Sequence, residues 1–255
     1  MTRATRRRWS SFAAMWAIAL AAAGCLPTPA TTEAHRTADL YTVFVAVAAV
    51  VAVIVIGLTL YAILRYRARG DDALPVQVRG SNRLEAFWTG IPLITVVVLF
   101  GLTLIVLNGF DDATRASSTV DIRVTAFRWG WRFEYPAEGV RVEGVKQPGP
   151  EAYVPVGENV HVSLTGNDVI HAFFVPQFLF KKDAVPGRVN EFAFTVDTPG
   201  RYGGQCAEFC GVFHSQMPFT IVAVSRPEYE AWLAANRGPA SSPASPASPS
   251  PGASP

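Results

Sequence analysis

Residues 87–135, "FWTGIPLITVVVLFGLTLIVLNGFDDATRASSTVDIRVTAFRWGWRFEY", decide the fold, because the spacing of apolar residues changes within them. From Phe87 to Leu107 the chain carries no charge and has the roughly 20 residues needed to cross the hydrocarbon core of a bilayer. From Ser117 onward, apolar and polar residues alternate, which is typical of β-strands. The stretch therefore predicts a membrane helix that is followed closely by a β-domain.

A second charge-free apolar run, residues 40–64, predicts another membrane-spanning helix before the first. The connecting loop, residues 65–86, holds more basic than acidic residues, namely Arg65, Arg67, Arg69, Arg79 and Arg83 against Asp71, Asp72 and Glu85. The positive-inside rule places such a loop in the cytoplasm, so the tether 25–39 and everything after Asn108 are expected outside. The net charge of +2 gives no indication of a nucleic-acid partner.

Residues 1–24 are predicted to be an export signal, since four arginines precede an apolar run that ends in small residues. Their ending, "AAGC", resembles the lipobox of bacterial lipoproteins, in which the signal is cut before a cysteine that becomes acylated. Cys25 is therefore expected to carry lipid, as an auxiliary tether, because a single acyl chain anchors weakly. The alternatives are an uncleaved third anchor helix or a signal that is cut elsewhere.

Residues 109–225 are predicted to form an all-β sandwich or small barrel, because alternating segments follow one another between glycines and prolines. A short helix is expected over 226–238, and the Pro/Ala/Ser-rich tail 239–255 is expected to be disordered. Between 109 and 238, twelve Lys and Arg stand against fifteen Asp and Glu. This domain charge of −3 would suit a basic partner, although the field is weak.

The segment "GGQCAEFCGVFHSQMPF", residues 203–219, concentrates metal-binding side chains in a chain with only three Cys, four His and three Met. Thiolate and imidazole ligands favour copper or zinc, and the thioether of Met217 favours copper. Cys206 and Cys210 could hold two copper ions, which would need an imidazole besides that of His214. His171, in "GNDVIHAFFVPQF", could return beside the loop to supply it.

Simpler interpretations exist for several of these residues. Cys206 and Cys210 could form a disulfide in an oxidising compartment, although the nearby His and Met favour a metal. His161 is interpreted as a surface or satisfied strand residue. Trp129 and Trp131 share one strand face by their spacing of two, which favours core or interface packing. Glu85 could be solvated or could cap its helix.

The segment "GQCAEFCGVFHSQMPF" has the Cys-x-Glu-x-Cys-x₃-His-x₂-Met pattern of the cytochrome c oxidase subunit II family, which has a binuclear copper A centre. The segments "FRWGWRFEY", "LEAFWTGIPL" and "TPGRYGGQC" are also similar to that family. The resemblance covers roughly residues 37–236. It implies a two-helix membrane hairpin followed by a cupredoxin-like β-sandwich.

The resemblance also implies a ligand set for two copper ions. Cys206 and Cys210 would bridge the ions, and His171 and His214 would each cap one. Met217 and the backbone carbonyl of Glu208 would be the weak ligands, and the Glu208 side chain would point towards a magnesium site shared with subunit I. Asp168, which lies near His171, could fix the imidazole.

Two further roles follow from the resemblance. Trp129 would be the point where electrons enter, beneath the surface that docks cytochrome c. Glu85 would lie at the mouth of a proton channel, at the cytoplasmic end of the second membrane helix. The chain departs from many relatives at Gly130, which stands where they have a third aromatic residue.

The implied function is that of subunit II of a respiratory cytochrome c oxidase in a bacterial cell membrane, with its copper domain on the outer side. It would pass electrons from a soluble or membrane-bound cytochrome c to the haem and copper centres of subunit I, where oxygen is reduced to water and protons are translocated. Subunits I and III and membrane lipid are the expected partners. Four histidines are too few for an oxygen-reducing site in this chain.

Three alternatives remain at the level of sequence. A nitrous oxide reductase-like enzyme would need a histidine-rich catalytic cluster that four histidines cannot supply. A membrane-tethered copper carrier or sensor would need an open, exchangeable site. A quinol oxidase subunit of the same fold would lack the copper ligands.

Overall fold

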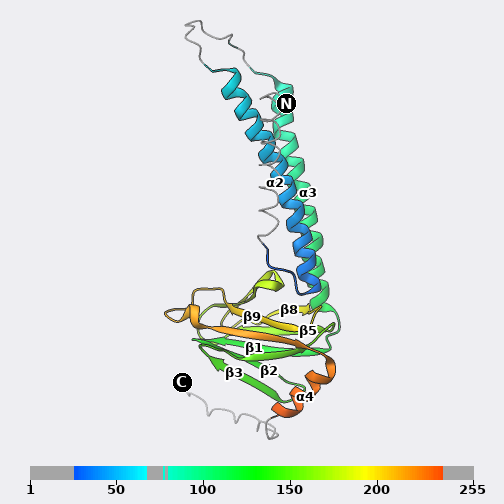
Figure 1. Ribbon diagram of the computed structural model, residues 1–255, viewed down its shortest axis with the longest axis vertical. Helices are drawn as coiled ribbons and strands as arrows, with labels where there is room; N and C mark the ends of the chain where they lie inside the picture. The colour runs from blue at the N-terminus through cyan, green and yellow to red at the C-terminus, as the bar shows by residue number, and fades with distance from the viewer. Residues whose placement is uncertain (1–25, 68–76, 78–79, 238–255) are drawn as a thin grey trace, which may run out of the picture. The chain divides into compact units, whose positions relative to one another are not determined.

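The computed structural model describes residues 26–67, 77 and 80–237 (Figure 1). The predicted signal peptide 1–24, the predicted lipidation site Cys25, half of the loop 65–86 and the tail 239–255 lie outside the described residues. The chain divides into two compact units between Asp112 and Ala113.

The first unit contains two long apolar helices, α2 (Thr32–Arg65) and α3 (Asn82–Arg115), of 34 residues each. At about 1.5 Å per residue each is about 50 Å long, which exceeds the roughly 30 Å of a hydrocarbon core. The apolar runs 40–64 and 87–107 lie within them, and both helices are long and apolar enough to cross a membrane. Their apolar side chains are exposed, as in Leu64 and Ile105, each 69% exposed, so these two helices anchor the chain in the membrane.

The second unit is a sandwich of two five-stranded sheets. The order of the first sheet is β3 (Val140–Val145), β2 (Gly130–Tyr135), β1 (Val120–Phe127), β5 (Asn159–Gly166) and β8 (Asn190–Thr195). The order of the second is β4 (Glu151–Pro155), β10 (Pro218–Val224), β9 (Gly200–Cys206), β6 (His171–Val175) and β7 (Phe180–Ala184). The pairs β1–β5 and β4–β10 are parallel and the other pairs are antiparallel.

The core lies between the two sheets, where every second side chain of a strand is buried. In β5, for example, Val160, Val162 and Leu164 are buried and their neighbours are partly exposed. Phe173 of β6 and Phe219 of β10, both in the second sheet, pack together in this core with ring centroids 4.7 Å apart. This architecture confirms the predicted fold class, two membrane helices followed by a cupredoxin-like β-sandwich.

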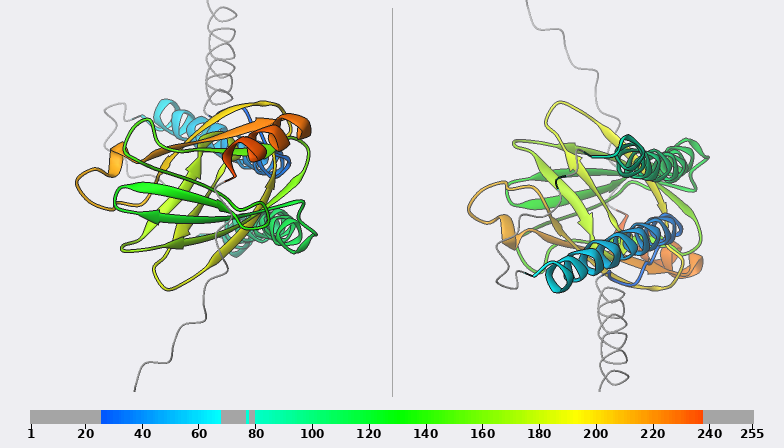
Figure 2. Two further views of the ribbon diagram at one scale, coloured as in Figure 1. Left: turned by 90° about the horizontal axis from the view of Figure 1, so that it is seen from below. Right: turned by 90° about the horizontal axis from the view of Figure 1, so that it is seen from above.

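Strand register brings three connections to one end of the sandwich. The β1–β2 turn follows the Phe127–Gly130 pair, and β1 runs parallel to β5 so that Ala126 lies beside Gly166. The chain then returns through residues 167–170 into β6, which pairs with the end of β9. The loop after β9 projects beyond the strands at this end (Figure 2). It contains the short 3₁₀ helix η2 (His214–Gln216).

The prediction that Trp129 and Trp131 share one strand face is wrong. The chain reverses between β1 and β2, so Trp129 lies in the turn and Trp131 lies in β2. Trp131 is fully buried, whereas Trp129 is partly exposed. Alternation predicts the face of a side chain only within one uninterrupted strand.

The C-terminal helix α4 (Arg226–Asn236) follows β10 and packs against β4 and β3. Ser225 and Glu228 form a capping box. The Ser225 side chain accepts the Glu228 backbone amide, and the Glu228 carboxylate accepts the Ser225 backbone amide. The Trp232 ring stacks on Tyr153 of β4 at 4.7 Å between centroids. A second 3₁₀ helix, η1 (Pro176–Phe178), joins β6 to β7.

Replacing Gly204 by alanine is expected to destabilise the sandwich by about 1–3 kcal/mol. A Cβ atom at Gly204 would lie 2.2 Å from the Phe219 ring, which is buried and packs against the rings of Trp131, Phe133 and Phe173. The neighbouring Gly203 is the matched control, because a Cβ there meets nothing within 4 Å. Urea unfolding of the full chain in detergent, followed by near-ultraviolet circular dichroism, measures both variants. Equal midpoints for the two variants would contradict this packing argument.

Candidate metal centre

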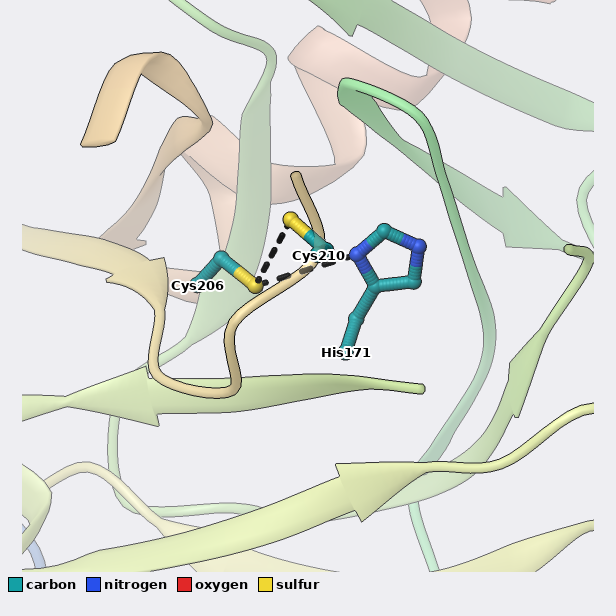
Figure 3. A group of neighbouring side chains, drawn as sticks. All are labelled: His171, Cys206 and Cys210. Atoms are coloured by element: carbon teal, nitrogen blue, oxygen red, sulfur yellow. Dashed lines mark hydrogen bonds between the residues drawn. The ribbon is translucent and has the colours of Figure 1, made fainter. Parts of the chain in front are cut away.

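Three side chains from separate segments converge at the loop end of the sandwich: His171 at the start of β6, Cys206 at the end of β9 and Cys210 in the loop that follows (Figure 3). Their ligand atoms all lie within 4.8 Å of one another. The Sγ atom of Cys206 is 3.8 Å from Cys210 Sγ and 3.8 Å from His171 Nδ1. All three residues are buried, and both cysteines are free thiols.

Backbone contacts hold the loop in place around these side chains. The Ala207 amide donates to the Ala172 carbonyl, and the Cys206 amide donates to the Met217 carbonyl. Gly211 has a φ of +118°, and its Cα faces the Trp129 ring so closely that a Cβ would lie 3.3 Å from it. A side chain at this position would be strained by the backbone as well as crowded by the ring. Glycine therefore lets the loop fold back over Trp129.

The structure brings the other predicted ligand positions to the same place. His214 Nδ1 lies 3.6 Å from Cys210 Sγ, and Met217 Sδ lies 4.0 Å from it. The Glu208 carbonyl accepts a hydrogen bond from Cys206 Sγ at 3.3 Å. The Glu208 carboxylate forms an ion pair with Lys181, so the carbonyl and the carboxylate of this residue serve different contacts.

Asp168 orients the buried imidazole. The Nε2 atom of His171 lies 2.9 Å from Asp168 Oδ1, and the same carboxylate accepts the backbone amides of Arg128 and Val169. Burial raises the pKa of Asp168, but the bond from His171 and the two amide bonds outweigh it and hold this pKa at about 2. The ionised carboxylate keeps a proton on Nε2, so Nδ1 is the nitrogen that faces Cys206.

The two thiols differ electrostatically. Burial raises the pKa of Cys206, but the imidazole of His171 and a hydrogen bond from the Ala172 amide lower it below its usual value. Burial also raises the pKa of Cys210, and the negative charge on Cys206 raises it further. Without a metal, Cys210 therefore holds its proton more tightly than Cys206 does. Metal binding must displace that proton, which couples affinity to pH.

The donor set fits a soft metal ion. Thiolate and imidazole groups suit copper or zinc, and the site is dry because its ligand side chains are buried. The two sulfur atoms, 3.8 Å apart, are separated by less than twice a metal–thiolate bond of about 2.3 Å, so both can contact one ion. The cluster of His171, Cys206 and Cys210 is consistent with a copper A site.

Three other residues that the sequence analysis named, His161, Glu85 and Trp129, are not part of the cluster. His161 Nδ1 is 3.5 Å from Asp121 Oδ1 on the outer face of the sheet, away from the cluster, which agrees with its interpretation as a satisfied strand residue. Glu85 lies in the first turn of α3, and its backbone amide donates to the Ser81 carbonyl. Trp129 is adjacent to the cluster, because its Nε1 donates to the Cys210 carbonyl at 3.2 Å.

Two supporting contacts could not be found from the sequence. Trp131 Nε1 donates to the Met217 carbonyl at 3.1 Å, and Phe213 packs edge-on against Trp129 with centroids 4.9 Å apart. The spacing of Trp131 indicates burial, but no pattern in the sequence tells which carbonyl its indole reaches. Both contacts join segments more than 80 positions apart in the chain.

Comparisons with known proteins agree with this site. A family model for the periplasmic domain of cytochrome c oxidase subunit II matches residues 147–224, and a model for its transmembrane domain matches residues 17–107. A cytochrome c oxidase subunit 2 of Alkalihalophilus pseudofirmus is 38% identical, over 73% of this chain and 54% of that protein. A probable cytochrome c oxidase subunit 2 of Streptomyces avermitilis is 34% identical, over 82% of this chain and 77% of that protein.

A solved structure is also similar. The periplasmic domain of cytochrome oxidase subunit II of Bradyrhizobium japonicum is 36% identical, with a TM-score of 0.46. That similarity covers 48% of this chain and 96% of the solved one. The chain thus spans about half of one curated relative and about three quarters of the other.

Replacing Asp168 by asparagine is expected to weaken copper binding by about 10- to 100-fold, because the imidazole of His171 loses the charge that orients it. Asp121→Asn is the matched control, since Asp121 also faces a histidine, His161, but one outside the cluster. Titration of the full chain against a copper(I) chelator measures both affinities. Equal affinities for the two variants would show that Asp168 does not support the ligand.

Proposed function

The chain belongs to the cytochrome c oxidase subunit II family, whose role is electron transfer from cytochrome c, and on this premise we propose that its Cys/His cluster is a binuclear copper A centre. The chain would accept electrons there and pass them to the haem and copper centres of a separate subunit I. Oxygen would be reduced to water in subunit I, with coupled proton translocation. The observation that carries the proposal is the convergence of His171, Cys206 and Cys210 within 4.8 Å.

The proposed ligands have distinct roles. Cys206 and Cys210 would bridge two copper ions, His171 and His214 would each cap one, and Met217 with the Glu208 carbonyl would complete the shell. Bound copper would supply a one-electron carrier whose charge is spread over two ions. The distances of His214, Met217 and the Glu208 carbonyl from the sulfur atoms support this set.

The protein would serve electron transfer by keeping the site rigid and dry. His171 is fully buried and Met217 is 1% exposed, so water has little access to these two ligands, whereas His214 is partly exposed. Asp168 holds the imidazole, and Trp131 holds the Met217 backbone. Groups that cannot move keep nearly the same geometry in both redox states, which lowers the barrier to electron transfer.

Trp129 is the proposed point where electrons enter. Its ring is partly exposed, and its indole N–H donates to the carbonyl of the proposed ligand Cys210. Phe213 and Gly211 hold the ring in contact with the loop. A donor that touches this ring would be one hydrogen bond away from the ligand backbone.

Other parts of the proposal concern the assembled oxidase. The Glu208 carboxylate, which Lys181 neutralises in this chain, would contribute to a magnesium site shared with subunit I. Glu85 would lie at the mouth of a proton channel. The copper domain would lie on the outer side of a bacterial cell membrane, with Cys25 lipidated and with subunits I and III and membrane lipid as partners.

Copper loading of the full chain tests the proposed centre. We expect two copper ions per chain and an electron paramagnetic resonance spectrum in which one unpaired electron couples equally to two copper nuclei. Cys210→Ser should abolish this pattern, because only one thiolate would remain to bridge the ions. A single copper ion in the unaltered chain, with hyperfine coupling to one nucleus, would instead favour the copper carrier.

Replacing Trp129 by phenylalanine tests the route of the electrons. In the oxidase complex we expect kcat/KM for cytochrome c to fall at least about tenfold, or about 1.4 kcal/mol, because the indole bond to Cys210 is lost. Trp232→Phe, in the α4 contact with Tyr153, should leave it unchanged. Stopped-flow reduction together with a copper assay separates this effect from loss of metal. Unchanged kinetics in Trp129→Phe would place the electron route elsewhere.

A further inference from the structure

The surface around Trp129 carries several exposed apolar side chains. We name it the Trp129 face and define it by Trp129, Val145, Lys146, Val212 and Phe213. Val212 is 84% exposed and Val145 is 60% exposed. Such exposed apolar side chains beside a proposed electron route are typical of a surface that contacts another protein.

Glycine at position 130 shapes this face. A Cβ at Gly130 would lie 2.3 Å from the Gly144 carbonyl, so no side chain fits at this position. Gly130 pairs instead with Val145 on β3, and Val145 projects into solvent. The apolar surface beside Trp129 is therefore supplied by β3 and by the loop after β9.

Lys146 contributes a positive charge to the Trp129 face. Its ammonium group lies 4.2 Å from the centre of the Phe213 ring, and its backbone amide donates to the Trp129 carbonyl. Lys146 has a φ of +56°, a left-handed conformation that non-glycine residues seldom adopt. Within the described chain, its side chain makes no ion pair, so its charge is available to a partner.

The carboxylates on the flanking segments are already engaged. Asp168 is bound by His171 and by Arg128. Glu143, on β3, accepts from Arg132 and Arg141 at 2.7 and 2.5 Å, and these bonds lower its pKa. These two carboxylates therefore add little negative field to the Trp129 face, whatever the net charge of the domain.

We propose that the Trp129 face takes a cytochrome c whose haem edge is surrounded by apolar and acidic residues. This inference rests on the proposed function, in which electrons enter at Trp129. A carboxylate of the donor would meet Lys146, and the apolar side chains would cover Val145, Val212 and Phe213. Surrounding charges set the orientation and the rate of encounter, while apolar contact supplies salt-independent affinity.

The test uses the complete oxidase complex in lipid nanodiscs and two oxidised probes, an acidic cytochrome c and a lysine-rich one. Dissociation constants are measured at low and at high ionic strength for three variants, Lys146→Glu, Lys146→Gln and Arg123→Glu. Arg123 is the matched control, because it is an exposed cation on β1 about 16 Å along the strand from the turn that holds Trp129. Both Lys146 variants keep a Cβ, so the backbone cost is unchanged.

We expect the acidic cytochrome to bind the unaltered complex more tightly than the lysine-rich one. Lys146→Glu should weaken the acidic complex by about three- to tenfold at low salt and strengthen the lysine-rich one, and Lys146→Gln should lie between. High salt should reduce these differences, and Arg123→Glu should cause none.

Tighter binding of the lysine-rich cytochrome, or equal effects of Lys146→Glu and Arg123→Glu, would overturn the inference. These binding constants do not depend on electron transfer, so this test can contradict the inference without contradicting the proposed function. If Trp129→Phe slows copper reduction while Lys146→Glu leaves both affinities unchanged, the electron route stands and the acidic partner is excluded.

Discussion

The burial of two thiols and one imidazole within 4.8 Å is the constraint on which the rest of the site depends. Each group is costly to bury in its ionised form, because a low-dielectric environment penalises ions. The protein reduces that cost by pairing His171 with Asp168 and by leaving one proton on Cys210. A metal ion is the natural completion of such a cluster, since it replaces the remaining proton and is satisfied by the same sulfur and nitrogen atoms.

The sandwich explains why the cluster can be so rigid. His171 and Cys206 lie on strands that are hydrogen-bonded to each other, and their positions are fixed by the register of β6 and β9. Cys210 lies on the loop, yet the loop is held at both ends, by the bond of Ala207 to β6 and by the bond of Trp131 to the Met217 carbonyl. A site built mainly on strands and tied loops changes little in shape when its charge changes.

Much of this arrangement could be predicted from the sequence, but the contacts between distant segments could not. The membrane helices follow from their uniform apolar runs, and the ligand loop follows from four soft side chains within twelve positions. The residue type and the resemblance predict His171 as a ligand, with Asp168 nearby to fix its imidazole, and the structure confirms that contact. The positions of Trp129 and Trp131 do not follow from the sequence, because a period of two does not reveal a chain reversal that lies between them.

The charge of a docking partner likewise cannot be predicted from the amino-acid composition of the domain. The domain carries more acidic than basic residues, so its net charge points to a basic partner. Charge acts over roughly 8–10 Å at physiological salt, so the local arrangement around the contact decides what is attracted. At the Trp129 face the carboxylates Asp168 and Glu143 are held by His171 and arginines, while Lys146 projects with its charge uncompensated among described residues. The sign of the field that a docking protein meets is therefore set by which charges are paired, a property of the fold that a count of residues does not contain.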